Sequence, residues 1–117
     1  MEQRTQHPLE SIIGEQLSAV VFVRDYVQFQ FDGPTLSCIT WPTLITGSSE
    51  IRHEDLRYRN ELCKRIGSSV RGAEVRERVD ITVTFDDDTS LVTSLKPEDY
   101  AGPEAAVFQG SGKTWVW

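Results

Sequence analysis

Apolar and polar residues alternate in two separate stretches of the chain. In the first, Val27, Phe29 and Phe31 alternate with two glutamines. In the second, residues 79–85, four apolar side chains alternate with Asp80 and two threonines. Because successive side chains of a strand point to opposite faces, this alternation predicts strands with one buried and one solvent-facing side.

Each alternating stretch forms the middle of a predicted three-strand meander, since short turns separate it from β-rich runs on both sides. The strands predicted for the first meander are 17–23, 26–31 and 35–41. Those predicted for the second are 70–76, 79–85 and 90–95.

The two meanders repeat each other in sequence. An Ile-Gly pair precedes each one, at Ile13-Gly14 and Ile66-Gly67, and a Phe-Asp pair ends each middle strand. The separation between matching residues drifts from 53 at the glycines to 55 at Leu36 and Leu91. Small loop insertions explain such a drift, so the sequence predicts an internal duplication.

The segment between the meanders has the clearest helical pattern. At 100° per residue, its apolar side chains form one stripe, made of Leu56, Tyr58, Leu62, Cys63 and Ile66. Acidic residues begin this segment and basic residues end it, which suits the helix dipole. We expect a helix over 54–66 that packs on the sheet, after a short hairpin or extended excursion around Gly47.

These elements predict the fold class α+β, with two β-meander repeats, about six main strands and one helix on the sheet. The polar residues 1–8 are expected to be a flexible leader, and 9–117 a single domain. Within that domain we predict repeat one at 12–42, a linker and helix at 43–66, repeat two at 66–97 and a C-terminal hairpin at 102–117.

Composition narrows the classes of function. The formal net charge of −6 disfavours nucleic acid and anionic membranes as partners, because the basic cluster at 52–65 is interleaved with acids. No apolar run approaches the roughly 20 residues of a membrane helix, and no signal peptide is visible, so the default location is cytoplasmic. Cys38 and Cys63 do not form a disulfide framework, and we expect buried thiols.

Two motifs suggest cofactors but lack essential parts. The stretch 110–114, Gly-Ser-Gly-Lys-Thr, resembles the end of a phosphate-binding loop, yet Val107 occupies the place of its first glycine and no helix can follow. The triple aspartate at 86–88 lies between strands and lacks the ligand spacing of a calcium loop. We interpret both as turns and expect no cofactor.

No catalytic or metal site is predicted. His7 and His53 have no partner at ligand spacing. His53 and Cys63 would be about 15 Å apart along a helix, too far for a nucleophile and its base. We therefore expect a protein without enzymatic activity.

Two regions are candidates for binding. The first is the proline-bounded loop with Glu98, Asp99, Tyr100 and Glu104, together with Trp41 at the matching strand exit of the first repeat. The alternative there is that Tyr100 packs and the acids cap a turn. The second is the end of the chain, where Trp115 and Trp117 share one strand face. These indoles close either the core of their own domain or the interface of a symmetric dimer.

Three stretches carry a resemblance to a known family. They are Phe31-Asp32-Gly33-Pro34-Thr35-Leu36, Pro97-Glu98-Asp99-Tyr100, and Gly102-Pro103-Glu104-Ala105-Ala106-Val107-Phe108. Over most of residues 12–117 the chain resembles a family of small uncharacterised bacterial proteins, a domain of unknown function. The resemblance implies a bacterial, cytosolic protein and no catalysis. In size and acidity alone, the chain is also similar to immunity proteins that neutralise toxin domains.

The leading hypothesis is a noncatalytic protein-binding module, immunity-like or self-associating. The alternative is a small enzyme or small-ligand-binding protein with a site near the Trp41 and Tyr100 loops. A concave pocket with converging polar groups favours the alternative, whereas a flat apolar patch with a charged rim favours the module.

Overall fold

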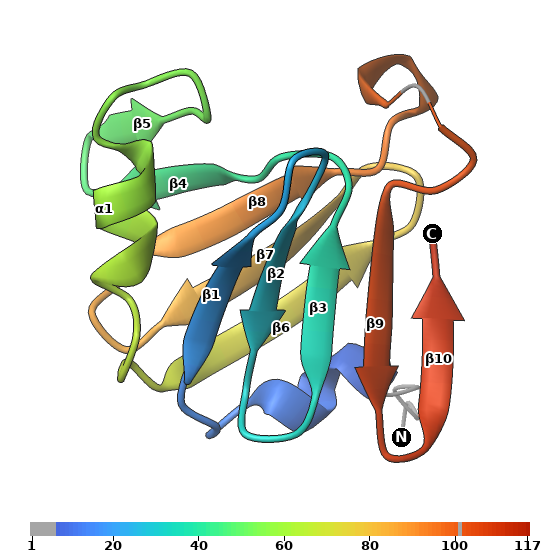
Figure 1. The fold of residues 1–117 in the computed structure, drawn as a ribbon. Helices are drawn as coiled ribbons and strands as arrows, with labels where there is room; N and C mark the ends of the chain where they lie inside the picture. The colour runs from blue at the N-terminus through green and yellow to red at the C-terminus, as the bar shows by residue number, and fades with distance from the viewer. Residues whose placement is uncertain (1–6, 101) are drawn as a thin grey trace, which may run out of the picture.

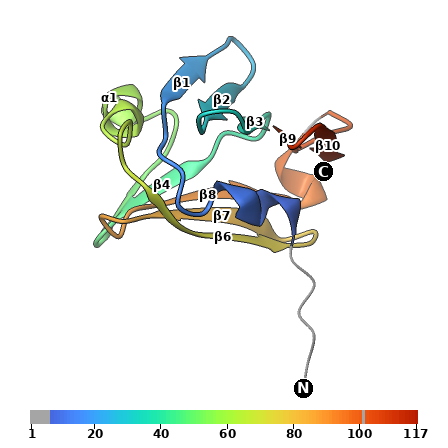
Figure 2. The same cartoon turned by 90° about the horizontal axis from the view of Figure 1, so that it is seen from below.

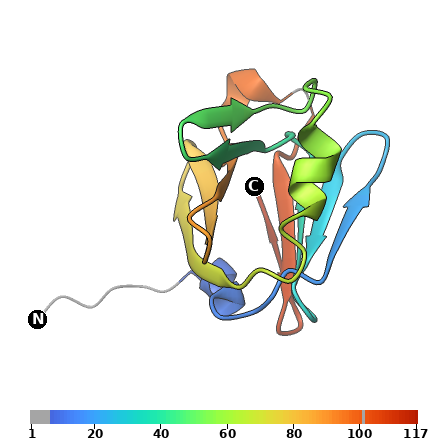
Figure 3. The same ribbon diagram turned by 90° about the vertical axis from the view of Figure 1, so that its left-hand side faces the viewer.

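Two antiparallel sheets of five strands each face one another and enclose the core (Figure 1 and Figure 3). The structure is a computed structural model that describes residues 7–100 and 102–117. The first sheet has the order β1 (Ala19–Phe22), β2 (Val27–Gln30), β3 (Thr35–Cys38), β9 (Ala106–Gly110), β10 (Lys113–Val116). The second has the order β5 (Ser49–Ile51), β4 (Thr43–Thr46), β8 (Ser90–Ser94), β7 (Asp80–Phe85), β6 (Val70–Arg76).

The helical elements of the described residues are short. They are η1 (Pro8–Ile12), α1 (Tyr58–Cys63) and η2 (Pro97–Asp99), of which η1 and η2 are 3₁₀ turns. Figure 2 shows η1 lying along β6, while α1 sits beside β1 at the other side of the molecule. Residues 1–6 of the predicted leader lie outside the described residues. His7 caps η1 and Pro8 is its first residue, so the predicted boundary of the leader after residue 8 falls inside this turn.

The predicted α+β class, with about six main strands and a helix on the sheet, is wrong, since the described residues form a β-sandwich of two five-stranded sheets and contain no long helix that covers either sheet. The helix expected over 54–66 is reduced to six residues. In the turn before α1, the carboxylate of Asp55 accepts hydrogen bonds from the backbone N–H of Arg57, at 2.8 Å, and from the guanidinium of Arg57. Leu56 is fully exposed, so the apolar stripe that suggested a longer helix does not exist in the fold.

The two cysteines differ. Cys38 is buried in the core, and burial raises the pKa of its thiol to about 12. Cys63 is exposed at the end of α1, so the prediction of a buried thiol is wrong there. The wrong prediction follows from the helical stripe, of which only Tyr58 and Leu62 are buried.

The sequence repeat corresponds to an exchange of hairpins between the sheets. The meander β1–β3 is followed by the hairpin β4–β5, which crosses over and pairs with β8 of the second sheet. The meander β6–β8 is followed by the hairpin β9–β10, which crosses back and pairs with β3 of the first sheet. Each half consists of one short helical element followed by five strands, and the two halves have the same connectivity.

Backbone hydrogen bonds relate the halves by a pseudo-twofold axis. The N–H of Gly14 donates to the carbonyl of Val70 at 2.8 Å, and the N–H of Gly67 donates to the carbonyl of Leu17 at 2.7 Å. An isolated antiparallel bridge joins Gln16 and Ser69 between these bonds. Because each bond has its counterpart with the partners exchanged, the axis passes close to this bridge.

The loop after Pro97 breaks this symmetry. Leu36 and Leu91 are equivalent at a separation of 55, and their cross-strand partners are Phe108 and Leu44. These partners are 64 residues apart. In the first half, β4 follows Pro42 directly, whereas in the second half a longer connection precedes β9. We call residues 97–105 the inserted loop.

The alternation of the middle strands can be tested by truncation. Phe85 is completely buried, whereas Thr84 lies on the other face of β7 with its hydroxyl near that of Ser90. We expect Phe85→Ala to lower the free energy of unfolding by about 3–5 kcal/mol, because it leaves a cavity. Thr84→Ala should cost well under about 1 kcal/mol. Equal losses in urea melts would contradict the strand register.

The pseudo-twofold axis can be tested at its two glycines. Gly14 and Gly67 have φ angles of +92° and +94°, and a Cβ at either position would meet no atom within 4 Å. Gly14→Ala and Gly67→Ala should therefore each cost about 1–2 kcal/mol from backbone strain alone. Gly72→Ala is the control, since Gly72 has no positive φ and equal open space. Clearly unequal losses at the two turns, measured by denaturant unfolding, would argue against their equivalence.

Candidate functional site

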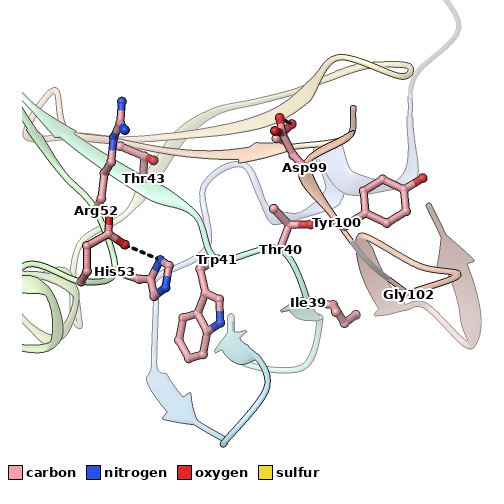
Figure 4. Close-up of a pocket in the computed structure, with 11 residues that line it drawn as sticks. Ile39, Thr40, Trp41, Thr43, Arg52, His53, Asp99, Tyr100 and Gly102 are labelled. Carbon is pink, nitrogen blue, oxygen red and sulfur yellow. Dashed lines mark hydrogen bonds and ion pairs between the residues drawn. The ribbon is translucent and has the colours of Figure 1, made fainter. Parts of the chain in front are cut away.

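A cleft of about 630 Å³ opens beside the inserted loop, where the chain leaves β3 and β8 (Figure 4). The lining residues come from the β3–β4 connection, the start of β4, the turn after β5, the end of β8 and the inserted loop. The residues lining the cleft are Ile39, Thr40, Trp41, Thr43, Arg52, His53, Glu54, Ser94, Asp99, Tyr100 and Gly102.

Aromatic contacts position one side of the cleft. The indole of Trp41 stacks on the imidazole of His53, with centroids 5.6 Å apart and an interplanar angle of 17°. Tyr58 of α1 meets the edge of Trp41, and its hydroxyl donates to the carbonyl of Pro42 at 2.5 Å. Burial raises the pKa of Tyr58, so the hydroxyl keeps its proton and remains the donor. The helix thus anchors the connection that carries Trp41.

The inserted loop forms the other side. The carboxylate of Asp99 accepts a hydrogen bond from the hydroxyl of Ser94 at 2.5 Å, which ties η2 to the end of β8. Tyr100 follows directly and packs partly against the core. In Figure 4, Trp41 and Tyr100 lie on different sides of the cleft, with Thr40 between them.

The charged groups at the rim are exposed. Arg52 and Glu50 are 3.7 Å apart, with side chains 66% and 59% exposed. His53 Nδ1 and Glu54 Oε2 are 3.0 Å apart, at 53% and 67%. Contacts between side chains this exposed to water stabilise a fold little. The guanidinium of Arg52 and the carboxylate of Glu54 therefore remain available to pair with charges of a bound molecule.

The structure brings only part of the predicted binding set together. Trp41, Asp99 and Tyr100 line the same cleft. Glu98 and Glu104 of the inserted loop are exposed and half-buried, respectively, and neither residue lines the cleft. Among the lining residues that the sequence does not predict are Arg52, His53 and Glu54. They were assigned to the approach and start of a helix, and no local pattern places them opposite the inserted loop.

The predicted aromatic pair at the chain end lies elsewhere. Trp117 packs against the core of its own domain, and its backbone N–H donates to the carbonyl of Ala106 at 3.0 Å. The imidazole of His7 stacks on Trp117 and meets Trp115 edge-on, with centroid distances of 5.2 and 5.4 Å. Trp115 remains 39% exposed. Trp117 thus closes the core of its own domain, and Trp115 borders a second groove.

The two cofactor-like motifs have structural roles. Asp87 accepts from the backbone and hydroxyl of Thr89 and pairs with Arg65 at 3.0 Å, and Asp88 pairs with Arg71. The Gly-Ser-Gly-Lys stretch is the turn of the β9–β10 hairpin, with positive φ angles at its two central residues. Within residues 7–100 and 102–117, no three His, Cys, Asp or Glu side chains gather as metal ligands. Among those residues, no helix has the length and apolar character needed to span a membrane.

Comparisons of the chain with protein-family models, curated proteins and solved structures find no match. The resemblance to a bacterial family therefore stays a prediction.

The contact between the two chain ends should respond to pH. His7 Nδ1 accepts a hydrogen bond from the backbone N–H of Leu9 at 3.1 Å, so the neutral ring caps η1. Burial lowers the pKa of His7 from its ordinary value of 6.5, although Glu77 and Glu10 oppose the shift. The unfolded chain therefore takes up this proton at a higher pH than the folded protein does.

We expect this contribution to stability to be lost as the pH falls from about 7.5 through 6.5 and below. His7→Asn keeps a capping side chain without a titrating group, so its melting temperature should fall less over the same interval. Thermal unfolding of both proteins at pH 7.5 and 5.5 measures the difference. Equal pH dependence in the two proteins would contradict the assignment.

Proposed function

We propose that the protein is a noncatalytic binding module whose partner is another protein, contacted through the cleft. The observation that carries the proposal is the inserted loop. The duplicated sandwich connects β3 to β4 without any such loop, so a connection of this length is not needed to cross from one sheet to the other. In the second half the loop adds Asp99 and Tyr100 to a cleft that already holds Trp41. Loops added to a rigid scaffold are common recognition elements.

The chemistry of the cleft resembles that of a protein interface. Two aromatic side chains, Trp41 and Tyr100, lie inside it, and aromatic residues are frequent hot spots of binding. The charged side chains of Arg52 and Glu54 and the imidazole of His53 border the cleft in water, as in the polar rim of such an interface. An acidic protein with net charge −6 would associate fastest with a basic partner.

A second candidate is a small-ligand-binding protein or a small enzyme with the same site. The volume of about 630 Å³ favours it, because it falls within the range of small-molecule pockets. Such pockets bury most of their ligand among apolar groups. Here the polar side chains of the rim, Arg52, His53 and Glu54, are more than half exposed, which suits a macromolecular surface better.

The proposal includes a cytoplasmic location and immunity-like neutralisation of a partner. The location is supported by the free state of Cys38 and Cys63, which suits a reducing compartment. The mode of action is supported by acidity and size alone, so the partner has to be found by experiment.

A pair of charge reversals tests the cleft. Arg52 lines it, whereas Arg71 lies outside it on β6, and each is an exposed arginine beside an exposed carboxylate. Proteins retained from a lysate of the source organism are identified and purified, and their dissociation constants are measured. We expect Arg52→Glu to weaken binding by about tenfold and Arg71→Glu by less than about twofold.

Equal effects of the two reversals would place the interface elsewhere. If no protein is retained and a metabolite library instead raises the melting temperature, with the rise lost in Asp99→Ala, the second candidate replaces the first. Ligand binding at a hundredfold excess over the dissociation constant adds about 2.7 kcal/mol, which such a screen detects.

A further inference from the structure

A second groove, of about 610 Å³, lies between η1, β6 and β10. It is distinct from the cleft beside the inserted loop, and the two share no lining residue. Its aromatic wall is formed by His7 and Trp115, and its charged groups include Glu10, Glu74, Glu77 and Lys113.

The outer edge of β10 has free backbone groups beside this groove. The backbone N–H of Trp117 donates to the carbonyl of Ala106, so the odd-numbered residues of β10 form the backbone hydrogen bonds to β9. The N–H and C=O groups of Thr114 and Val116 therefore point away from β9. Among the described residues, no further strand pairs with β10 on that side.

The other three sheet edges are protected. β6 has charged side chains along it and a bulge between Val70 and Gly72, and β5 has only three residues. On β1, helix α1 packs beside the strand, and Arg59 of this helix lies over the ring of Phe22 at 5.7 Å. Short, charged, bulged or covered edges disfavour the addition of another strand. On β10, by contrast, Val116 is 54% exposed.

Trp115 points from this edge toward the groove. It lies opposite Phe108 in the antiparallel pair, and Phe108 is buried, so both side chains are on the inner face of the sheet. A strand added to β10 would place every second side chain on this same face, next to the indole.

The charges of the groove favour a cation there. Glu74 and Glu77 are exposed on and after β6, and the structure shows no ion pair for either within residues 7–100 and 102–117. The nearby Arg76 is held by Asp80, with its Nε 2.9 Å from the carboxylate. Apart from Arg76, the lysine or arginine that lines the groove is Lys113, and the lining includes three carboxylates, those of Glu10, Glu74 and Glu77. A guanidinium or ammonium group over the face of an indole is further stabilised by a cation–π interaction.

We propose that this groove binds an extended segment of another protein that carries lysine or arginine. The segment adds to β10 as a sixth strand of the first sheet, pairing with Thr114 and Val116. Its basic side chain lies against Trp115 and near Glu74 and Glu77. The proposal does not rest on the function proposed for the cleft.

The probe is a blocked peptide of alternating lysine and threonine, titrated into the full chain at low salt and followed by backbone amide NMR. Binding should shift the amides of Thr114 and Val116. Thr114→Pro removes an outward N–H without removing a bond to β9, so affinity should fall by about tenfold. The double change Glu74→Gln and Glu77→Gln should do the same, and Glu98→Gln, an exposed acid outside the groove, should leave affinity unchanged.

A peptide N-methylated at alternate residues cannot pair as a strand and should not bind, which covers the case of a misfolded Thr114→Pro protein. Full affinity of that peptide would overturn strand addition. Equal affinity for a peptide with glutamine in place of lysine would overturn the cationic occupant. A stable dimer that Thr114→Pro dissociates, with no binding of the peptide, would assign the edge to a second copy of the chain.

Discussion

The architecture depends on the reciprocal backbone hydrogen bonds at the pseudo-twofold axis. The bonds from Gly14 to Val70 and from Gly67 to Leu17 join the start of one half to the start of the other. Both glycines have positive φ angles, which let the chain turn from a helical segment into the first strand of its half. Because the two starts are joined in this way, the meanders face each other and each hairpin meets the opposite sheet.

This exchange of hairpins links the stability of the halves. A meander alone would expose the apolar face of its three strands, and the two crossing hairpins complete both sheets instead. Across the core, the hydroxyl of Thr93 on β8 donates to the sulfur of its equivalent, Cys38 on β3, at 3.4 Å. The two halves therefore do not form separate hydrophobic cores, and the buried residues of the described domain form a single core.

Binding surfaces arise where the halves differ. The inserted loop makes the second half longer than the first and supplies Asp99 and Tyr100 to the cleft. On β10, Trp115 is equivalent to Ile51 of β5. Trp115 pairs with Phe108 and Ile51 pairs with Leu44, and Phe108 and Leu44 are themselves equivalent. Ile51 is buried, whereas Trp115 is partly exposed beside the second groove. Symmetry thus builds the scaffold, and departures from it provide the surfaces available for recognition.

Residues such as Val83 and Phe85 could be placed from the sequence because alternation is a local property, and both are buried on β7. The duplication and its glycine turns could be read in the same way. The helix at 54–66 could not, because a stripe of period 3.6 also occurs where Asp55 holds a turn and Leu56 meets only water. Which sheet each hairpin joins, and hence that Arg52 and His53 face Tyr100 across a cleft, depends on burial between strands far apart in sequence. Only the tertiary structure decides that, since local patterns specify the face of a strand and not its neighbour.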